Sequence, residues 1–566
     1  MANVTLPAVT GRPSPHDHHP GPSGGAGAAG AVAVAATRER LRERLGLPHP
    51  DPAWWAWVVA GTIGVLAGVL RFVRLGRPPV LVFDETYYVM QAWSLALHGH
   101  ERDEVADPAP PDPLPEDWSD TYADDLFESG TLDVFQATPD FVVHPPLGKW
   151  MIAAGMQIDP DDTFFWRFSA AIAGTLSVVL LVLVARRLLG STLLGGVAGL
   201  LLAVDGHHIV QSRTSLLDIF LSFWILVAFA FLLADRFAAR ERLADRVARA
   251  VHAGTLSPYG PWLGWRPFRL LAGLSLGAAC ATKWSGLYVL AAFGLLTVLW
   301  DLDARRTAGV RRWFVGGLLR DSWPAFLATV PVAFVVYLVS WTGWFLADDS
   351  YNRTWAQENP DEAVSWLPQS LASLWEYHHS AYNFHTTINV VDNDHPYMAN
   401  PWSWLIQGRP TSFHYQGQND GVTGCGADAC SSAVTSLGNP VVWWGGTLAL
   451  VVVALAWVLR RDWRAGAILV PLAACYLPWF AYQERTVFSF YAVALVPFLV
   501  LGLTYALGLV LGTSEASAER RLWGAVGAGA VVVGAVGCLF FFYPVWTAEV
   551  ITTDAWRLRM WWPSWV

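Results

Sequence analysis

Two adjacent carboxylates stand directly after the first long apolar run of this 566-residue chain. Asp84 and Glu85 lie in the segment LVFDETYYV, where the chain leaves that run. A carboxylate held beside a hydroxyl can take its proton as a general base. An ordinary loop end or helix cap is the alternative interpretation, so the pair needs support from residues elsewhere in the chain.

A rigid turn follows later in the same connection, in the segment FVVHPPLGKW. His144 precedes Pro145 and Pro146, whose rings restrict the backbone, and Gly148 permits the close approach of another element. Such a turn beside a membrane can position reacting groups. A purely architectural role is the alternative.

Cations mark three further segments. In VDGHHIVQSRTSLLDIF, Arg213 stands five positions before Asp218, which suits either a mutual ion pair between two helix ends or a direct ligand role. Lys283, in ATKWSGL, is the only charged residue between Arg269 and Asp301. A lone charge in an apolar stretch is costly unless it meets an anion or a water-filled cavity, or reaches the membrane surface. Arg485 follows Glu484 in YQERTVFSFY.

The elements that must position these residues are membrane helices. The chain is 54% hydrophobic and only 15% charged, whereas soluble domains carry about 25% charged residues. Apolar runs with at most one charged residue approach or exceed the roughly 20 residues that cross a bilayer; examples are 54–70, 216–234, 441–459 and 522–543. The 32 Trp residues suit membrane interfaces. A large soluble aromatic core does not explain runs of this length.

Hydropathy predicts an all-α polytopic membrane protein with eleven spans. They are 53–72, 164–185, 191–208, 215–234, 269–281, 286–300, 323–346, 440–459, 465–482, 487–511 and 522–543. One long buried helix over 269–300 is the alternative to two spans there. Lys and Arg concentrate in alternate connections, which predicts a cytoplasmic N-terminus and a C-terminus outside.

This topology divides the chain into four parts. We expect a disordered cytoplasmic tail over 1–52, ending in a short basic helix, and a membrane module over 53–346 with an outer loop at 73–163. An extracytoplasmic loop over 347–439 and the C-terminal helices with an outer tail over 440–566 follow. The net charge of −9 comes largely from 101–140, which holds thirteen Asp or Glu and one Arg. An acidic, solvated loop does not indicate binding to nucleic acid.

The candidate residues all map to one side of the membrane under this topology. They are Asp84, Glu85, His144, Arg213, Lys283 and Arg485. Carboxylates beside cations at a lipid–water boundary suit transfer from a lipid phosphate ester. The cations stabilise the leaving phosphate while a carboxylate deprotonates the incoming hydroxyl.

Two of the five cysteines lie in the polar segment GVTGCGADAC, which the topology places outside the cell. An oxidising compartment permits a disulfide between Cys425 and Cys430. A metal site is the alternative, but no second His/Cys pair stands at ligand spacing.

These segments together resemble the protein O-mannosyltransferases, membrane enzymes of the GT-C fold that move mannose from a polyprenyl-phosphate-mannose to Ser or Thr. The resemblance runs from about residue 53 to 545. Its most specific pieces are FDETYY, HPPLGK, WRFSAAIAG, QSRTSLLD and TKWSGL, in that order. The segment 347–439 is too short for the MIR domain of eukaryotic members, which points to the bacterial form.

The resemblance implies a role for each matched position. Asp84 would be the catalytic base, with Glu85 beside it in the site. His144, Pro145 and Pro146 would shape the site. Four further residues would support the site or meet the phosphate: Arg167, Arg213, Lys283 and Arg485. Asp218 matches the family's Arg-to-Asp spacing and would give positional support.

The expected activity is therefore an inverting transfer of mannose to Ser or Thr of secreted or membrane proteins, at the outer face of the cell membrane. No cofactor is expected, because the lipid-linked sugar is a substrate. The proposed chemistry does not require a metal ion, and metal dependence stays open. Expected partners are the bilayer, unfolded secretory polypeptides and the translocon. The alternatives are a GT-C transferase acting on a lipid or cell-wall glycan, a transporter, and a non-catalytic scaffold. His395 and Arg409 are weaker site candidates, with surface packing as their alternative role.

Overall fold

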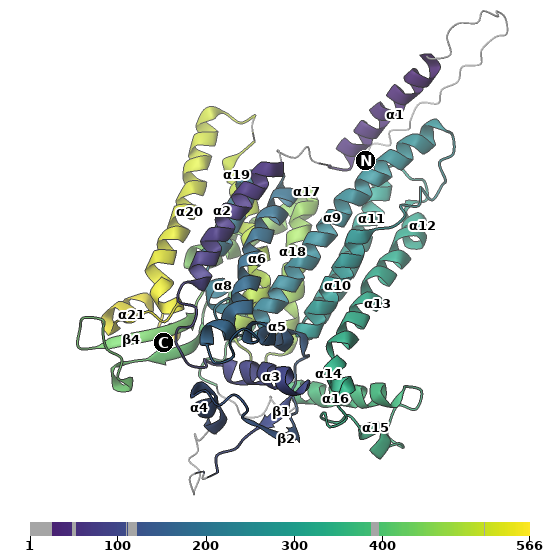
Figure 1. The fold of residues 1–566 in the computed structure, drawn as a ribbon. Coiled ribbons are helices and arrows are strands. Elements are labelled where there is room, and N and C mark those ends of the chain that lie inside the picture. The colour runs from purple at the N-terminus through teal and green to yellow at the C-terminus, as the bar shows by residue number, and fades with distance from the viewer. Residues whose placement is uncertain (1–24, 48–52, 109, 111–120, 387–394, 514) are drawn as a thin grey trace, which may run out of the picture.

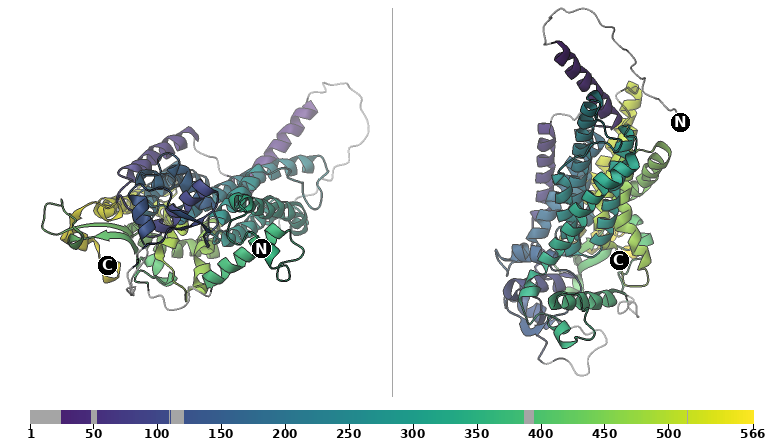
Figure 2. Two further views of the ribbon diagram at one scale, coloured as in Figure 1. Left: turned by 60° about the horizontal axis from the view of Figure 1, so that its bottom comes forward. Right: turned by 90° about the vertical axis from the view of Figure 1, so that its right-hand side faces the viewer.

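Long helices lying side by side form the body of the protein, in a computed structural model that describes residues 25–47, 53–108, 110, 121–386, 395–513 and 515–566. The bundle is much longer along its helices than it is thick, as the side view in Figure 2 shows. Short helices and strands gather at one end of it (Figure 1).

Nine helical segments of the described chain are long and apolar enough to cross a membrane. They are α2 (Ala53–Phe72), α6 (Thr163–Leu189), α9 (Leu217–His252), α11 (Gly286–Thr307), α12–η1–α13 (Trp313–Gly317, Leu318–Ser322, Trp323–Ser340), α17 (Pro440–Arg460), α18–η5 (Trp463–Tyr476, Leu477–Ala481), η6–α19 (Ser489–Leu495, Val496–Leu511) and α20 (Ala518–Trp546). The other two predicted spans correspond to the shorter apolar helices α7 (Thr192–Ala203) and α10 (Pro267–Thr282). A helix is thus present at every predicted span, while the count of eleven crossings stays a prediction.

The stretch 269–300 is two helices, as predicted. α10 ends at Thr282, Lys283 has extended backbone angles, and α11 begins at Gly286. A side chain at position 286 would lie 2.8 Å from the backbone of Ala279, so glycine allows the two helix ends to approach. The break places Lys283 and its neighbours at the end of the bundle that carries the short elements.

The core centres on α9, which packs against α6, α10, α11 and the N-terminal helix α1 (Gly25–Arg44). The first half of α9 is buried nearly all round, as an apolar helix inside a bundle must be. α1 includes most of the short basic helix predicted at the end of the tail, and Leu41 of α1 and Leu45, just after it, are buried with Leu243 of α9. Residues 1–24 and 48–52 of that tail lie outside the described residues.

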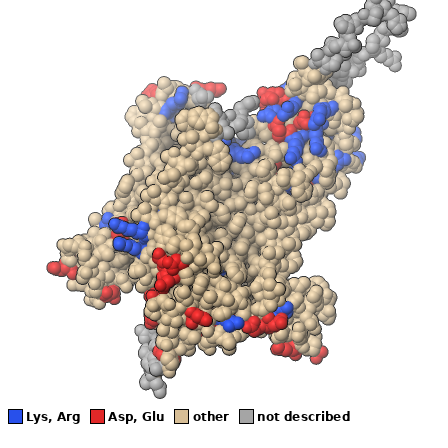
Figure 3. Space-filling model, in the orientation of Figure 1, with Lys and Arg blue, Asp and Glu red and all other residues tan. Residues whose placement is uncertain are grey.

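Charges gather at the two ends of the molecule. On the face shown in Figure 3, a broad band without Lys, Arg, Asp or Glu separates them. α1 lies at one end, and the C-terminus lies at the other with the connections predicted to be outside (Figure 1). That arrangement is consistent with a membrane around the band. Which end faces out of the cell stays a prediction.

The predicted outer loop 73–163 is structured at this second end. It holds α3 (Glu85–His98), β1 (Arg102–Glu104), α4 (Tyr122–Glu128), β2 (Phe135–Pro139) and α5 (Leu147–Met156). β1 and β2 pair antiparallel, so part of the acidic segment is ordered rather than a free loop. α8 (Gly206–Gln211), α14 (Thr342–Leu346), α15 (Trp355–Glu358) and α16 (Gln369–Thr386) lie at the same end.

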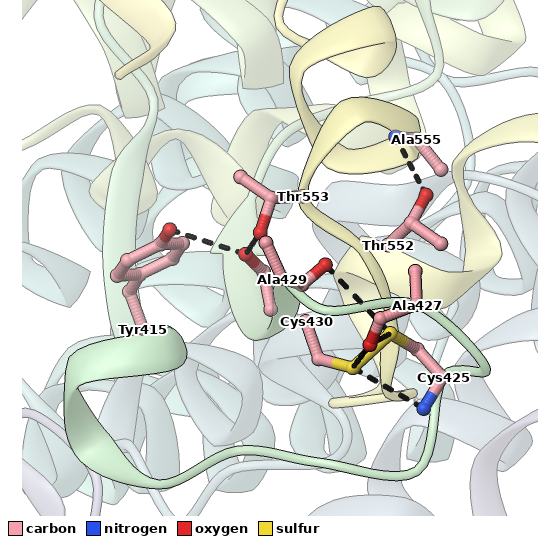
Figure 4. Close-up of a disulfide and its surroundings, with 9 residues drawn as sticks. Tyr415, Cys425, Ala427, Ala429, Cys430, Thr552, Thr553 and Ala555 are labelled. Carbon is pink, nitrogen blue, oxygen red and sulfur yellow. Dashed lines mark hydrogen bonds between the residues drawn. A yellow bond between two sulfur atoms is a disulfide. The ribbon is translucent and has the colours of Figure 1, made fainter.

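A three-stranded antiparallel sheet completes this end. Its order is β3 (Thr411–Gln416), β4 (Cys430–Ser436) and β5 (Ile551–Thr552). β4 is buried along its whole length, and Thr411 pairs with Ser436. The remaining short elements are η3 (Pro401–Ile406), η4 (Gln418–Asp420), α21 (Thr553–Arg559) and η7 (Pro563–Trp565). Cys425 and Cys430 form the predicted disulfide, with Cα atoms 5.7 Å apart (Figure 4).

Candidate active site

Asp84 is held by an aromatic anchor on the residue before it. Phe83 has a positive φ of 51°, which is rare for a bulky side chain and costs energy unless the surroundings enforce it. Its ring stacks on Phe413 of β3 at 5.0 Å and meets the edges of Phe488 and Phe490. Asp84 then stands at the N-terminus of α3 with no capping hydrogen bond from its side chain.

The Asp84 carboxylate is free to react. It makes no hydrogen bond and no ion pair with any residue that the structure describes, although it is partly buried. Burial raises the pKa of Asp84 to about 7; Lys283 opposes this rise and Asp218 adds to it. A carboxylate with a pKa near neutrality is a far stronger base than an exposed one, and a substantial fraction of it is ionised at neutral pH.

The activity should therefore depend on pH through this group. A base acts when deprotonated, so kcat/KM is expected to level off above pH about 7 and to fall about tenfold per unit below it. Steady-state rates between pH 5.5 and 8.5, with protein integrity checked at each pH, provide the measurement. A flat profile through pH 6 would show that no group with this pKa limits the reaction.

Glu85 is fully engaged in the protein, in contrast to Asp84. It is buried and receives two hydrogen bonds from Arg167, at 2.8 and 2.7 Å, and one from the Ser215 amide at 2.8 Å. Arg167 also donates to the carbonyls of Pro78 and Val80. This arrangement fixes the backbone before Asp84, and we interpret both residues as positioning groups.

Lys283 meets an anion, as its apolar surroundings require. Its ammonium group lies 2.9 and 3.0 Å from the two carboxylate oxygens of Asp218 and 4.3 Å from the centre of the Tyr491 ring. Lys283 is therefore buried beside its partner and does not reach for the membrane surface. The pair stands close enough to Asp84 for both charges to influence its pKa.

The alternative ion pair between Arg213 and Asp218 is wrong. Arg213 instead donates to the carbonyls of Arg71, Val73 and Arg74, at 2.7 to 2.9 Å. The last carbonyl groups of a helix lack N–H donors within the helix. Arg213 supplies such donors where α2 ends. Its role in the structure is to hold α2 against the start of α9.

His144 lies between two aromatic side chains. Its ring stands 6.1 Å from Tyr88 and stacks on His385 of α16 at 5.4 Å. Burial and the nearby Lys283 hold the pKa of His144 well below its usual range, so the ring is neutral at neutral pH. Pro145 and Pro146 are buried, and Pro146 precedes the first residue of α5. The His-Pro-Pro turn thus starts a helix and presents His144 to the site.

A cavity of about 300 Å³ opens beside this group of residues. Its cations are Lys283 and Arg485, and its wall is largely aromatic: Trp284, Tyr288, Tyr382, Trp479, Tyr482 and Tyr491, with His144 and His385. The Arg485 side chain makes no hydrogen bond or ion pair with any described residue. Trp284 and Ser285, just before α11, also line the cavity, so the positive end of that helix lies there.

The structure brings together most of the predicted residues. Lys283, His144 and Arg485 line the cavity, with Asp84 and Asp218 in electrostatic contact with Lys283. Arg167 and Arg213 are engaged elsewhere. Arg409 bonds to carbonyls of Pro396 and the C-terminus, which fits its packing role, and His395 packs on Phe488.

Sequence reasoning missed the aromatic wall and His385. These positions carry no charge pattern, and abundant Trp and Tyr in a membrane protein predict interfacial placement rather than a site. The indication available was the cluster of His and aromatic residues in WEYHHSAYNFH, which forms α16 above the cavity.

A free carboxylate, paired charges and an aromatic cavity with an unpaired cation suit the displacement of an anionic leaving group by a hydroxyl. Two family models match the chain: dolichyl-phosphate-mannose-protein mannosyltransferase over residues 145–313, and the C-terminal four-transmembrane region of protein O-mannosyltransferase over 370–565. Polyprenol-phosphate-mannose–protein mannosyltransferases of Mycolicibacterium smegmatis and Corynebacterium glutamicum are 38% and 32% identical, over 90% and 92% of this chain and 93% and 96% of their own lengths. The chain belongs to this protein mannosyltransferase family.

The fold agrees with the family. A chain of the Saccharomyces cerevisiae protein O-mannosyltransferase Pmt1–Pmt2 complex, solved with its sugar donor, superposes with a TM-score of 0.64 over 94% of each chain at 14% identity. The predicted GT-C fold is thereby confirmed. As a member of the protein mannosyltransferase family, the protein is a multi-pass membrane glycosyltransferase.

Proposed function

We propose that the protein transfers mannose from polyprenyl-phosphate-mannose to Ser or Thr hydroxyls of secreted or membrane proteins, at the outer face of the cell membrane. The observation that supports this most is the Asp84 carboxylate, which has no partner among the described residues and lies next to a cavity that carries Lys283 and Arg485. The names of the bacterial relatives point to the same donor and to protein acceptors.

In this proposal Asp84 accepts the proton of the acceptor hydroxyl while that oxygen attacks the anomeric carbon of mannose. The bond from the anomeric carbon to the phosphate oxygen breaks, and the polyprenyl phosphate leaves with the electron pair. Lys283, Arg485 and the N-terminus of α11 stabilise the developing negative charge. A single displacement of this kind inverts the anomeric configuration. The leaving phosphate is a weak base, so the step needs no acid catalyst.

Acceptors would arrive as unfolded segments, because a Ser or Thr hydroxyl must reach a carboxylate that is partly buried. Chains that emerge from the translocon meet this requirement. The aromatic wall of the cavity would lie along the first isoprenoid units of the donor, where apolar contact adds affinity.

The direct test is mannose transfer by the purified protein in lipid, with polyprenyl-phosphate-mannose and a Ser/Thr-rich peptide. The expected product is a mannosylated peptide whose anomeric configuration is opposite to that of the donor, as resolved by NMR. Transfer to a lipid or cell-wall glycan but not to the peptide would replace this proposal with the rival acceptor class. Retention of configuration would refute the single displacement.

Arg485 offers a test of the phosphate site. Replacing it by Met removes a cation without stranding a described carboxylate partner, so the fold should persist. We expect the KM for the donor to rise about tenfold or more, with the KM for the peptide unchanged, because charge-assisted bonds to phosphate contribute about 1.5–3 kcal/mol. Arg77→Met, at an exposed arginine, is the control. An equal loss for both substrates would place Arg485 outside the donor site.

A further inference from the structure

The sheet of β3, β4 and β5 ends in an unpaired strand edge. β4 is the middle strand, so β3 pairs on one side only. Beyond β4, the backbone of β3 makes no hydrogen bond with any other described element; its one further contact, between Ser412 and His414, stays within the strand. A row of unpaired N–H and C=O groups is a template on which another strand can add.

One end of this edge lies beside Asp84. Phe413, in the first half of β3, stacks on Phe83, the residue that precedes Asp84. Thr411 and Ser489 place their hydroxyl oxygens 3.5 Å apart, which ties the start of β3 to η6. η6 also carries Tyr491, whose ring lies against the ammonium group of Lys283. The first half of β3 is therefore buried next to the residue that precedes Asp84, while its second half, with Tyr415 and Gln416, is exposed.

The other end of β3 opens into a polar cleft of about 590 Å³. Its wall includes Tyr415, Gly417–Asp420, Ala427–Ala429, Thr552–Asp554 and Arg557. The Cys425–Cys430 disulfide closes the short loop that supplies Ala427 and Ala429 (Figure 4). The Ala429 carbonyl accepts a hydrogen bond from the Thr553 amide. From Phe413 to Gln418 an extended chain covers five residues at about 3.3 Å each, roughly 17 Å.

We propose that the acceptor polypeptide binds as an added strand on the free edge of β3, with its reacting hydroxyl at Asp84 and its flanking residues in the polar cleft. This inference rests on the proposed function. Strand addition draws its affinity from main-chain hydrogen bonds, so it accepts many sequences. An enzyme that modifies diverse unfolded segments needs such tolerance, and an unfolded segment has the free backbone groups to pair.

His414 supports an occupant at this edge. It lies in the middle of β3, and its Nε2 atom is buried without a partner among the described residues. A buried polar atom without a hydrogen bond costs free energy. A strand laid along β3 would bring carbonyl, amide or hydroxyl groups within its reach.

The test uses the unmodified protein and a series of peptides. Each peptide has about nine residues with one central Thr, and one backbone amide at a time carries an N-methyl group. In an added strand, every second amide of the peptide points toward β3, and the amides between them point away. Methylation of an amide that points toward β3 is expected to lower kcat/KM at least about tenfold, because it removes a hydrogen bond and adds a clash. Methylation of an amide that points away from β3 should change kcat/KM less than about threefold.

A capped single Thr, too short to pair with β3, is the companion acceptor, and its rate sets the baseline without strand addition. Transfer to all peptides with no alternation, or a uniform loss at every position, overturns the strand proposal and leaves the proposed function intact. Failure to mannosylate even the unmethylated peptide and the capped Thr would count against the proposed function itself.

Discussion

Replacing Asp84 by Asn is expected to lower mannose transfer at least about a hundredfold, the low end of what removal of a general base costs. Asn keeps the size of the side chain but cannot accept the proton of the acceptor hydroxyl. The fold should persist, since the carboxylate has no partner in the described structure and burial already favours its neutral form. Initial rates at saturating donor and peptide, at matched protein levels in membranes, provide the measurement.

Asp361 provides the matched control. It is an exposed aspartate between α15 and α16, and Asp361→Asn should leave the rate within about twofold, as surface substitutions usually do. Thermal unfolding of the Asp84 variant should occur at or above the wild-type temperature. If Asp84→Asn transferred mannose at the wild-type rate, Asp84 would not be the general base, and another group at the cavity would have that role.

The largest effect on stability is expected for Arg167→Met, a loss of about 3–5 kcal/mol, because this change leaves the Glu85 carboxylate buried without its cation. Both side chains of the pair are fully buried, and Arg167 also ties the backbone between Leu75 and Val80 to the bundle. The measurement is thermal unfolding in detergent or nanodiscs, together with the yield of folded protein.

The double variant Glu85→Gln with Arg167→Met separates the contribution of the ion pair to stability from its contribution to activity. Removing both charges should restore part of the lost stability, because no uncompensated charge remains, while transfer stays impaired by the loosened backbone before Asp84. Recovery of full activity together with stability would show that the pair serves the fold alone. A stable Arg167→Met protein would contradict the buried ion pair altogether.

The helices could be predicted from the sequence because apolar runs of sufficient length have few alternatives in a membrane. The split of 269–300 into two helices followed from the placement of basic residues, since two spans keep Arg305 to Arg320 on the same side as the other basic connections. The Ala- and Gly-rich start of α1 was not recognised as helical, because glycine is a weak helix former and this segment holds no continuous apolar run.

Partners of buried charges were harder to predict. Arg213 and Asp218 lie close in sequence, yet Asp218 pairs with Lys283 and Arg213 with the end of α2. Where several helices meet, the distance between two residues in the sequence says little about whether they form an ion pair. Backbone carbonyl groups at a helix end are also possible partners, and no residue type marks them. For the same reason the sequence suggested that Asp84 and Glu85 act as a pair, whereas among the described residues Glu85 has partners and the Asp84 carboxylate has none.

The contact of Phe83 with Phe413 and Phe490 also bears on biogenesis. The base lies early in the chain, whereas the rings that hold its backbone are made roughly 330 to 400 residues later. At ribosomal speeds of about 5–20 residues per second, this interval lasts on the order of tens of seconds. During that time a growing chain already carries Asp84 but lacks the anchor that orients it. The enzyme should thus remain inactive until η6, which carries Phe490, has been made.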